Sequence, residues 1–190
     1  MRYCIINILS EPYKKYHWDI VCSIAEKFPK LIETKEQQIP PHFTLKYEFE
    51  TDDITKVENV LEEFVKKHRP APVSIGGLDK FGELVVFVKV QLSKDAKIVF
   101  DELIDELHNF SWIQWQEHDG KNLIFHSTVA EECAGLDGEV MNFVKGKEQY
   151  FKSEFNNMSI MVETGKTEHG YRKWELYKRF DFKLDQVNHG

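Results

Sequence analysis

The order of apolar patterns along this chain of 190 residues repeats once. Each half shows a strand, an amphipathic helix, a strand that contains an aligned histidine, a second helix and a closing strand. The two histidines, His42 and His126, are 84 residues apart, and the first strands of the halves, near Arg2 and Leu84, are 82 residues apart. Offsets that agree this closely indicate an internal duplication, with units at about 1–81 and 82–190.

The periodicity of apolar residues places the individual elements. The expected strands are 2–9, 40–50, 73–78, 83–92, 122–132, 152–163 and 171–182, and the expected helices are 12–28, 54–65, 93–107 and 136–147. Alternating helices and strands with short connections predict an α+β fold. We expect one bilobal domain over 1–190, with two pseudo-symmetric lobes. Each lobe is an antiparallel sheet with helices on its outer face, and a central cleft separates the two.

The composition limits the kind of partner. The formal net charge is -7, with 42% hydrophobic and 30% charged residues, which is typical of a globular domain with a filled core. Binding along a nucleic acid depends on neutralising many phosphates, so this charge argues against wrapping a long nucleic acid. A small phosphorylated nucleotide or an RNA end, held in a local basic pocket, remains compatible with it.

Cysteine usage and apolar runs indicate the compartment. Cys4, Cys22 and Cys133 show no CxxC spacing, which predicts reduced and buried thiols. The apolar run near the N-terminus is too short for a secretory segment, and none reaches the roughly 18 residues of a membrane span. We expect a cytoplasmic monomer without membrane attachment.

The strand at 40–50, PHFTLKYEFE after Pro40, alternates between apolar and polar residues throughout. Successive side chains of a strand point to opposite faces, so His42, Thr44 and Lys46 share the polar face. The sequence FHSTVA repeats this arrangement in the second half, where His126 and Thr128 share a face. Two lobes related by approximate two-fold symmetry would bring the two His/Thr pairs to one cleft.

Paired histidines and hydroxyls suit the cleavage of a phosphoester by in-line displacement. One neutral imidazole removes a proton from the attacking oxygen, and one protonated imidazole donates to the departing oxygen. An unperturbed imidazole pKa near 6.5 permits both roles near neutral pH. The threonine hydroxyls can donate to the phosphate oxygens, and the proton transfers require neither a metal nor another cofactor.

The tetrapeptides His42-Phe43-Thr44-Leu45 and His126-Ser127-Thr128-Val129 resemble the paired H-apolar-[Thr/Ser]-apolar motifs of the two-histidine (2H) phosphoesterase superfamily. That group includes the 2'-5' RNA ligase-like proteins and the RNA 2',3'-cyclic phosphodiesterases. The resemblance implies a bilobal fold, His42 and His126 as catalytic residues, Thr44 and Thr128 as phosphate-binding residues, and no cofactor.

The sequence departs from the pattern of that family in two ways. Ser127 stands where the family usually has an apolar residue, and we expect its side chain to face away from the cleft. The RNA ligase-like branch often has a basic residue just after the second motif, where this chain has Glu131 and Glu132. That departure argues against RNA-sized substrates, and phosphodiesters remain the expected class of substrate.

Further side chains are candidates for contacts with substrate. Lys46 could supply positive charge or be a solvated strand lysine. Tyr171 and Arg172 could reach a nucleotide, although basic residues that protect an edge strand are the slightly favoured interpretation. For Trp112 and Trp115, packing is favoured over a platform for a base.

The remaining histidines are interpreted as structural. His17 is expected on the exposed side of the first helix, and the others near helix ends, in loops or in the tail are His68, His108, His118, His169 and His189. Because no HExxH or paired CxxC spacing occurs, no metal site is expected.

The sequence thus predicts a metal-independent phosphodiesterase that acts on a 2',3'-cyclic phosphate or a related nucleotide or RNA-end phosphodiester. The alternative is a non-catalytic nucleotide- or RNA-binding protein that uses the same cleft, because a fold does not fix a function. A purely structural interaction domain is a third possibility.

Overall fold

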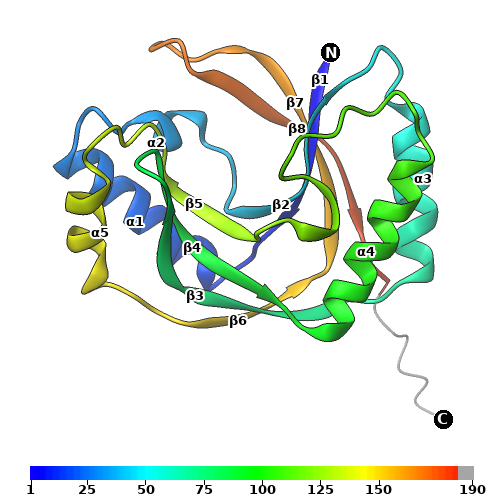
Figure 1. Ribbon diagram of the computed structural model, residues 1–190, viewed down its shortest axis with the longest axis horizontal. Helices are drawn as coiled ribbons and strands as arrows, with labels where there is room; N and C mark the ends of the chain where they lie inside the picture. Colours follow the sequence, from blue (N-terminus) through cyan, green and yellow to red (C-terminus); the bar gives the residue numbers. More distant parts are fainter. Residues whose placement is uncertain (184–190) are drawn as a thin grey trace.

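Two four-stranded antiparallel sheets form the framework of the computed structural model, which describes residues 1–183 (Figure 1). His189 and the rest of 184–190 lie outside the described residues. The first sheet has the order β2-β1-β7-β8 and the second β5-β4-β3-β6. The strands are β1 (Arg2–Ile8), β2 (His42–Glu50), β3 (Ala71–Phe81), β4 (Val85–Leu92), β5 (His126–Ala130), β6 (Phe151–Phe155), β7 (Asn157–Lys166) and β8 (Arg172–Asp181).

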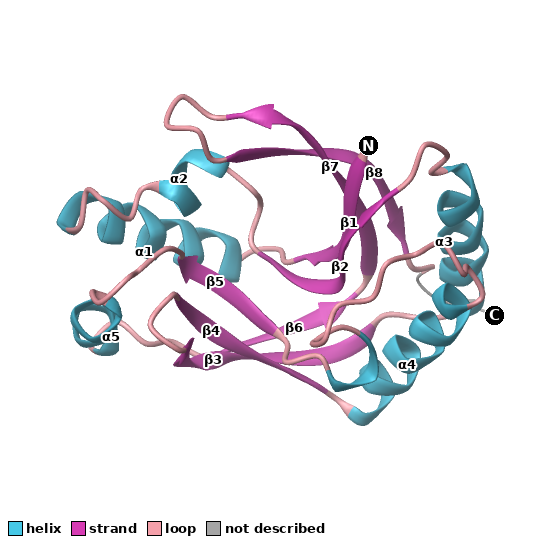
Figure 2. Ribbon diagram, turned by 45° about the horizontal axis from the view of Figure 1, so that its top comes forward, coloured by secondary structure: helices cyan, strands magenta, loops and turns pink. Residues whose placement is uncertain are grey.

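The helices gather at two ends of the molecule (Figure 2). They are α1 (Tyr13–Lys27), α2 (Glu33–Gln37), α3 (Thr55–Lys67), α4 (Lys94–His108) and α5 (Asp137–Lys145), with a short 3-10 turn η1 (Gly120–Asn122). One end holds α1, α2 and α5, and the other holds α3 and α4. The expected cap of α4 is confirmed, since Ser93 Oγ accepts the backbone N–H of Ala96 at 3.1 Å. The sequence patterns did not predict α2.

Each sheet takes strands from both halves of the sequence. β3, from the first half, pairs with β4, and β7, from the second half, pairs with β1. The order β2-β1-β7 in one sheet matches β5-β4-β3 in the other, so the two histidine strands occupy equivalent places. The expected α+β fold with two antiparallel sheets is confirmed.

The strand expected over 152–163 is wrong, because the chain changes sheets at Asn156. Hydrogen bonds from two buried asparagines fix this crossing. Asn157 Oδ1 accepts the N–H of Ile8 at 3.0 Å, and Asn7 Oδ1 accepts the N–H of Asn157 at 3.2 Å. These bonds replace ladder bonds that the bend would otherwise leave unmade in the interior.

The main apolar core lies on one face of each sheet, under the long helices. Phe43 packs edge to face against Phe125 and Phe155, so the core is continuous between the sheets. Burial of these side chains is the main contribution to stability. The opposite face of the first sheet carries a small second cluster of Ile6, Met161 and Trp174 beside the pocket described below. Within residues 1–183, no helix combines the length and apolar character needed to cross a membrane.

Candidate active site

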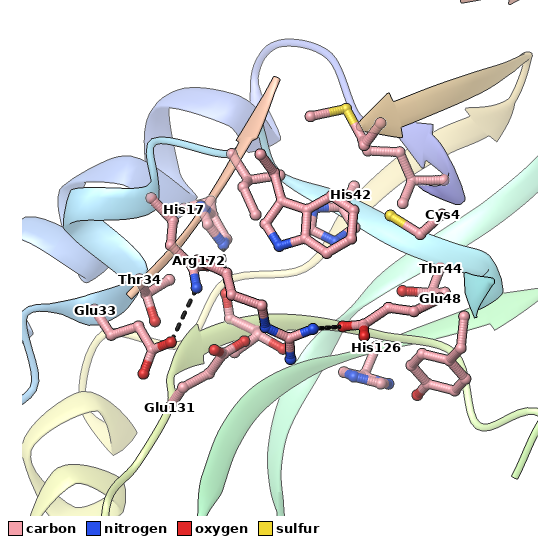
Figure 3. Close-up of a pocket in the computed structure, with 17 residues that line it drawn as sticks. Cys4, His17, Glu33, Thr34, His42, Thr44, Glu48, His126, Glu131 and Arg172 are labelled. Carbon is pink, nitrogen blue, oxygen red and sulfur yellow. Dashed lines mark hydrogen bonds and ion pairs between the residues drawn. The ribbon is translucent and has the colours of Figure 1, made fainter. Parts of the chain in front are cut away.

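The two histidine strands meet at one pocket between the sheets (Figure 3). β2 contributes His42 and Thr44, and β5 contributes His126 and Thr128. The cavity measures about 200 Å³. The structure therefore brings together the four residues of the two motifs, and their chemical roles stay a prediction. The other lining residues are Cys4, Ile6, His17, Glu33, Thr34, Gln37, Ile39, Tyr47, Glu48, Glu131, Met161, Arg172 and Trp174.

Both motif imidazoles are oriented in the same way. His42 Nδ1 donates to the carbonyl of Pro40 at 2.8 Å, and His126 Nδ1 donates to the carbonyl of Ile124 at 2.7 Å. In each case the acceptor is two residues before the histidine. A carbonyl oxygen can only accept, so each Nδ1 carries the proton and each Nε2 is left to exchange protons with a ligand.

Burial favours the neutral form of both imidazoles. Burial is the largest cause that lowers the pKa of His42 to about 4; the charges that His17 and His126 can carry act in the same direction, and the bond to Pro40 opposes the shift. The pKa of His126 is also lowered by burial, while its bond to Ile124 opposes the shift. Because the charge of His126 acts on His42, the two rings lie close enough to influence one another's protonation.

Aromatic side chains fix the position of the His126 ring. The rings of Phe81 and Phe87 lie with centroids 4.8 Å and 5.0 Å from the centroid of the imidazole. The Phe81 contact is edge to face, a favoured geometry for aromatic pairs. These contacts leave the ring little rotational freedom beyond its bond to Ile124.

The threonine hydroxyls are available for a ligand. Within residues 1–183, neither Thr44 nor Thr128 uses its side-chain oxygen in a hydrogen bond. Ser127, between the second motif's His126 and Thr128, is buried and does not line the pocket, as expected from strand alternation.

Arg172 supplies the positive charge of the pocket. Its guanidinium pairs with Glu48 of β2 and lies 6.0 Å from the ring centre of Trp174. Among the described residues that line the pocket, no other arginine or lysine occurs. Tyr171 does not line it; its backbone closes the turn with Thr167 instead. β8 is an edge strand, so the protective role considered for its basic residues also applies.

The uninterrupted alternation expected for β2 is wrong, and Lys46 does not line the pocket. The register of β1 and β2 shifts around Ile5, so Leu45 and Lys46 are both buried. Lys46 Nζ is fully buried and forms an ion pair with Asp119 at 2.7 Å. The bulge places Tyr47 and Glu48 in the pocket.

The exposed position expected for His17 is also wrong. His17 lines the pocket, with 4% of its surface exposed, and its Nε2 donates to the carbonyl of Thr128 at 2.7 Å. Burial lowers its pKa to about 4. The spacing of Tyr13, His17, Ile20 and Ile24 follows one helical face, and this signal could have revealed the buried histidine.

An acidic end of the pocket was also missed. Glu131 follows β5, and burial together with the nearby Glu33 raises its pKa to about 7. Burial raises the pKa of Glu33 as well. The sequence signal was present, because Glu131 stands two residues after the second motif, in the segment where the related branch often has a basic residue.

The aromatic and histidine residues away from the pocket have packing roles. Trp112 packs against the core, and Trp115 stacks on His108 with ring centres 3.9 Å apart. His68 stacks on Phe64 at 4.0 Å. Within the described part of the chain, no group of three or more His, Cys, Asp or Glu side chains has the arrangement of a metal site.

Comparison with known families agrees with this geometry. The family model of the 2'-5' RNA ligase superfamily matches residues 18–156, which include both histidine strands. The chain belongs to the 2'-5' RNA ligase superfamily. Membership confirms the resemblance that the two tetrapeptides indicated.

Relatives of this superfamily member occur in bacilli. A protein of Bacillus mycoides (strain KBAB4), provisionally named a phosphoesterase, is 23% identical over 145 residues, which cover 75% of this chain and 78% of that protein. A protein of Bacillus cereus (strain AH820) with the same provisional name has the same identity and coverage.

Solved structures share the fold. The protein TT0787 of Thermus thermophilus matches with a TM-score of 0.59 and 12% identity, over 96% of this chain and 98% of that one. LigT of E. coli in complex with 3'-AMP matches with a TM-score of 0.58, at the same identity and coverage. At such identities, the likeness establishes the two-lobed fold alone.

Proposed function

We propose that this superfamily member is a phosphodiesterase that opens a 2',3'-cyclic phosphate, or cleaves a related phosphodiester of a nucleotide or RNA end, by acid-base catalysis. The observation that carries the proposal is the pair of imidazoles in one pocket, each with Nδ1 held by a carbonyl and with Nε2 unpaired among residues 1–183. The provisional name of the bacillary relatives supports a phosphoesterase. LigT complexes with 3'-AMP and ATP support a nucleotide ligand.

The asymmetry of the two histidines suggests their roles. His42 is more deeply buried and its pKa is lowered to about 4, so its Nε2 is a free acceptor at neutral pH and suits the general base. Removal of a proton from water by His42 lets the water oxygen form a bond to phosphorus. The bond to the ribose oxygen breaks, and that oxygen takes the proton of His126 Nε2. Exchange with solvent then restores both protonation states.

The remaining groups of the pocket hold the phosphate. The hydroxyls of Thr44 and Thr128 donate to the non-bridging oxygens, whose charge the transition state retains. Arg172, kept in place by Glu48, adds a permanent positive charge within the same cavity. These contacts orient the ester so that the attacking and departing oxygens face opposite imidazoles.

The experiment that tests the proposal is hydrolysis of 2',3'-cyclic mononucleotides and cyclic-phosphate-ended oligonucleotides in the presence of EDTA. We expect turnover in the native chain and a loss of about 10²–10⁴-fold in His42→Ala and His126→Ala. His118→Ala is the matched control, because His118 is exposed and does not line the pocket.

Activity that EDTA abolishes would contradict the metal-independent scheme. Turnover that persists in either pocket variant at the level of His118→Ala would contradict the assigned roles. Nucleotide binding without turnover would instead favour the non-catalytic binding protein.

A further inference from the structure

A row of residues crosses the second sheet from His126 to its far edge. Lys89 of β4 is the register partner of His126. Gly76 and Gly77 lie at the bulge of β3 opposite Lys89, and Tyr150, directly before β6, follows on the other side. Partners in an antiparallel pair lie on the same face, so Lys89 shares the face of His126. Four adjacent strands give this row a length of about 14 Å.

A second hollow of about 420 Å³ lies along this row. We call it the side groove and define it by Gly76, Gly77, Lys89, Gln91, Tyr150 and Lys152. It belongs to the same sheet face as the second His/Thr pair and begins at the cross-strand neighbour of His126. A ligand held at the histidines can therefore continue into the side groove without passing through the core.

The two glycines shape the side groove. A Cβ at Gly76 would collide with the ring of Tyr150, and a Cβ at Gly77 would lie 3.0 Å from Cε of Lys89. The missing side chains let the aromatic ring and the lysine lie against the backbone of β3. Tyr150 is 77% exposed: its ring carbons Cγ, Cδ1 and Cε1 lie against Gly76, and most of the side chain is open to solvent.

The side groove is basic, in contrast to the far end of the pocket. In the part of the chain that the structure describes, neither Lys89 nor Lys152 has a carboxylate within ion-pair distance. Glu148 is nearby, but its Oε1 accepts the N–H of Leu78 at 3.1 Å and so anchors the segment before Tyr150 to β3. At the other end of β5, Glu131 and Glu33 line the pocket, and neither side chain offers a positive charge to a second phosphate.

We propose that the side groove binds the penultimate nucleotide of a short oligonucleotide whose terminal cyclic phosphate lies between His42 and His126. This inference rests on the proposed function. Lys89 contacts the phosphate that joins the last two nucleotides, and the base of the penultimate nucleotide stacks on Tyr150. Stacking on an aromatic ring is tolerant of sequence, so the preference is for length and not for a particular base.

The path of the strand has a consequence for the chemistry. A strand that leaves the pocket beside Lys89 places the terminal ribose on the side of His126, whose protonated form then donates to the departing oxygen. The acidic end at Glu131 stays empty of phosphate. The basic side groove beside the acidic end of the pocket explains how a chain of net charge -7 can hold two phosphates and still reject a long nucleic acid.

The test compares kcat/KM for cyclic-phosphate-ended substrates of one, two and three nucleotides. We expect kcat/KM of the dinucleotide to exceed that of the mononucleotide roughly tenfold or more, with little further gain for the trinucleotide, because only the penultimate base stacks on Tyr150. In Tyr150→Ala and Lys89→Gln the ratio falls toward one, whereas Tyr150→Phe retains it. Lys56→Gln, an exposed lysine on α3, is the control that keeps the native ratio.

A second arm measures Kd for 3'-phosphorylated mono- and dinucleotides, which are not substrates, by fluorescence anisotropy. Turnover with equal kcat/KM for all lengths overturns the side groove and leaves the phosphodiesterase standing. No turnover, but tighter dinucleotide binding that Tyr150→Ala removes, supports the side groove and overturns the phosphodiesterase. If there is neither turnover nor a length preference in binding, both the side groove and the phosphodiesterase are overturned.

Discussion

The two motif histidines depend on carbonyl oxygens that no motif contains. Pro40 and Ile124 occupy equivalent positions, two residues before each histidine, and each accepts the Nδ1 proton. The interaction sets the tautomer, and burial then lowers the pKa of each ring. At the scale of residues, the pocket thus holds two imidazoles that are matched in orientation and unequal in basicity.

This inequality predicts an acidic pH optimum for kcat/KM. The base, His42, has a pKa of about 4 and is neutral above that pH. The pKa of the acid, His126, is lowered from 6.5, so this residue loses its catalytic proton at a pH below 6.5. We expect a bell-shaped profile with both limbs below pH 6.5. Bound phosphate favours the charged imidazole, so the falling limb of kcat should lie at higher pH. A flat profile between about pH 5 and 8 would contradict the mechanism.

Glu131 should make the stability depend on pH. Its folded-state pKa of about 7 lies above the ordinary 4.5. The contribution of the protonated carboxyl to the stability of the fold is therefore fully present below pH 4.5 and is lost as pH rises through about 7. Glu131→Gln should therefore raise the free energy of unfolding at pH 8 by on the order of 3 kcal/mol, and by almost nothing at pH 4.5. Urea unfolding at both pH values measures the difference.

Glu26 of α1 provides the control for that prediction. Glu26 is exposed and does not line the pocket, so Glu26→Gln should leave the pH dependence as it is in the native chain. Equal effects of the two substitutions would show that the carboxyl of Glu131 is not desolvated by folding.

At the scale of elements, the bulge in β2 decides which side chains reach the pocket. The shift beside Ile5 turns Lys46 into the interior and brings Tyr47 and Glu48 to the cavity. Asp119 supports this bend, since it pairs with the Lys46 ammonium and its Oδ1 accepts the N–H of Tyr47 at 3.1 Å. The ion pair therefore positions Glu48, which in turn holds Arg172.

Breaking this buried pair should be costly. Asp119→Ala leaves the fully buried ammonium of Lys46 without its partner, and we expect a loss of about 3–5 kcal/mol in the free energy of unfolding. Asp105→Ala is a matched control, because the pair of Asp105 with Lys121 is exposed and should contribute less than about 1 kcal/mol. Similar losses in the two variants, measured by urea unfolding, would contradict a structural role for the Lys46–Asp119 pair.

At the scale of the whole molecule, the exchange of strands between halves joins the two sheets into one structure. β3 and β7 each pair with the first strand of the other half, and the core is continuous through Phe43 and Phe155. We therefore expect one cooperative unfolding transition, with loss of activity and loss of secondary structure at the same urea concentration.

The crossing at Asn156 tests this cooperativity. Asn157→Ala removes the acceptor for the Ile8 N–H, and we expect unfolding to become easier by about 1–3 kcal/mol while remaining a single transition. Asn59→Ala, at an exposed position of α3, should change stability by less than about 0.5 kcal/mol. Two separate transitions in Asn157→Ala would show that the sheets fold independently.

Local patterns in the sequence were sufficient for most elements and for the two His/Thr pairs. Alternation identifies a strand from its own residues, and an aligned repeat identifies equivalent strands. The same patterns failed at His17, where helical spacing was assigned from Trp18 instead of Tyr13. They also failed at Lys46, because a bulge depends on the partner strand and leaves no mark in the alternation of β2 itself.

Contacts between residues far apart in the chain could be identified only in the folded structure. The change of sheet at Asn156, the closure of the pocket by Arg172 and the basicity of His42 each depend on burial beside segments from the other half. Strand and helix patterns come from the local alternation of side chains, so a linear sequence contains them. Desolvation, charge proximity and strand exchange come from three-dimensional packing, and the order of residues does not specify them locally.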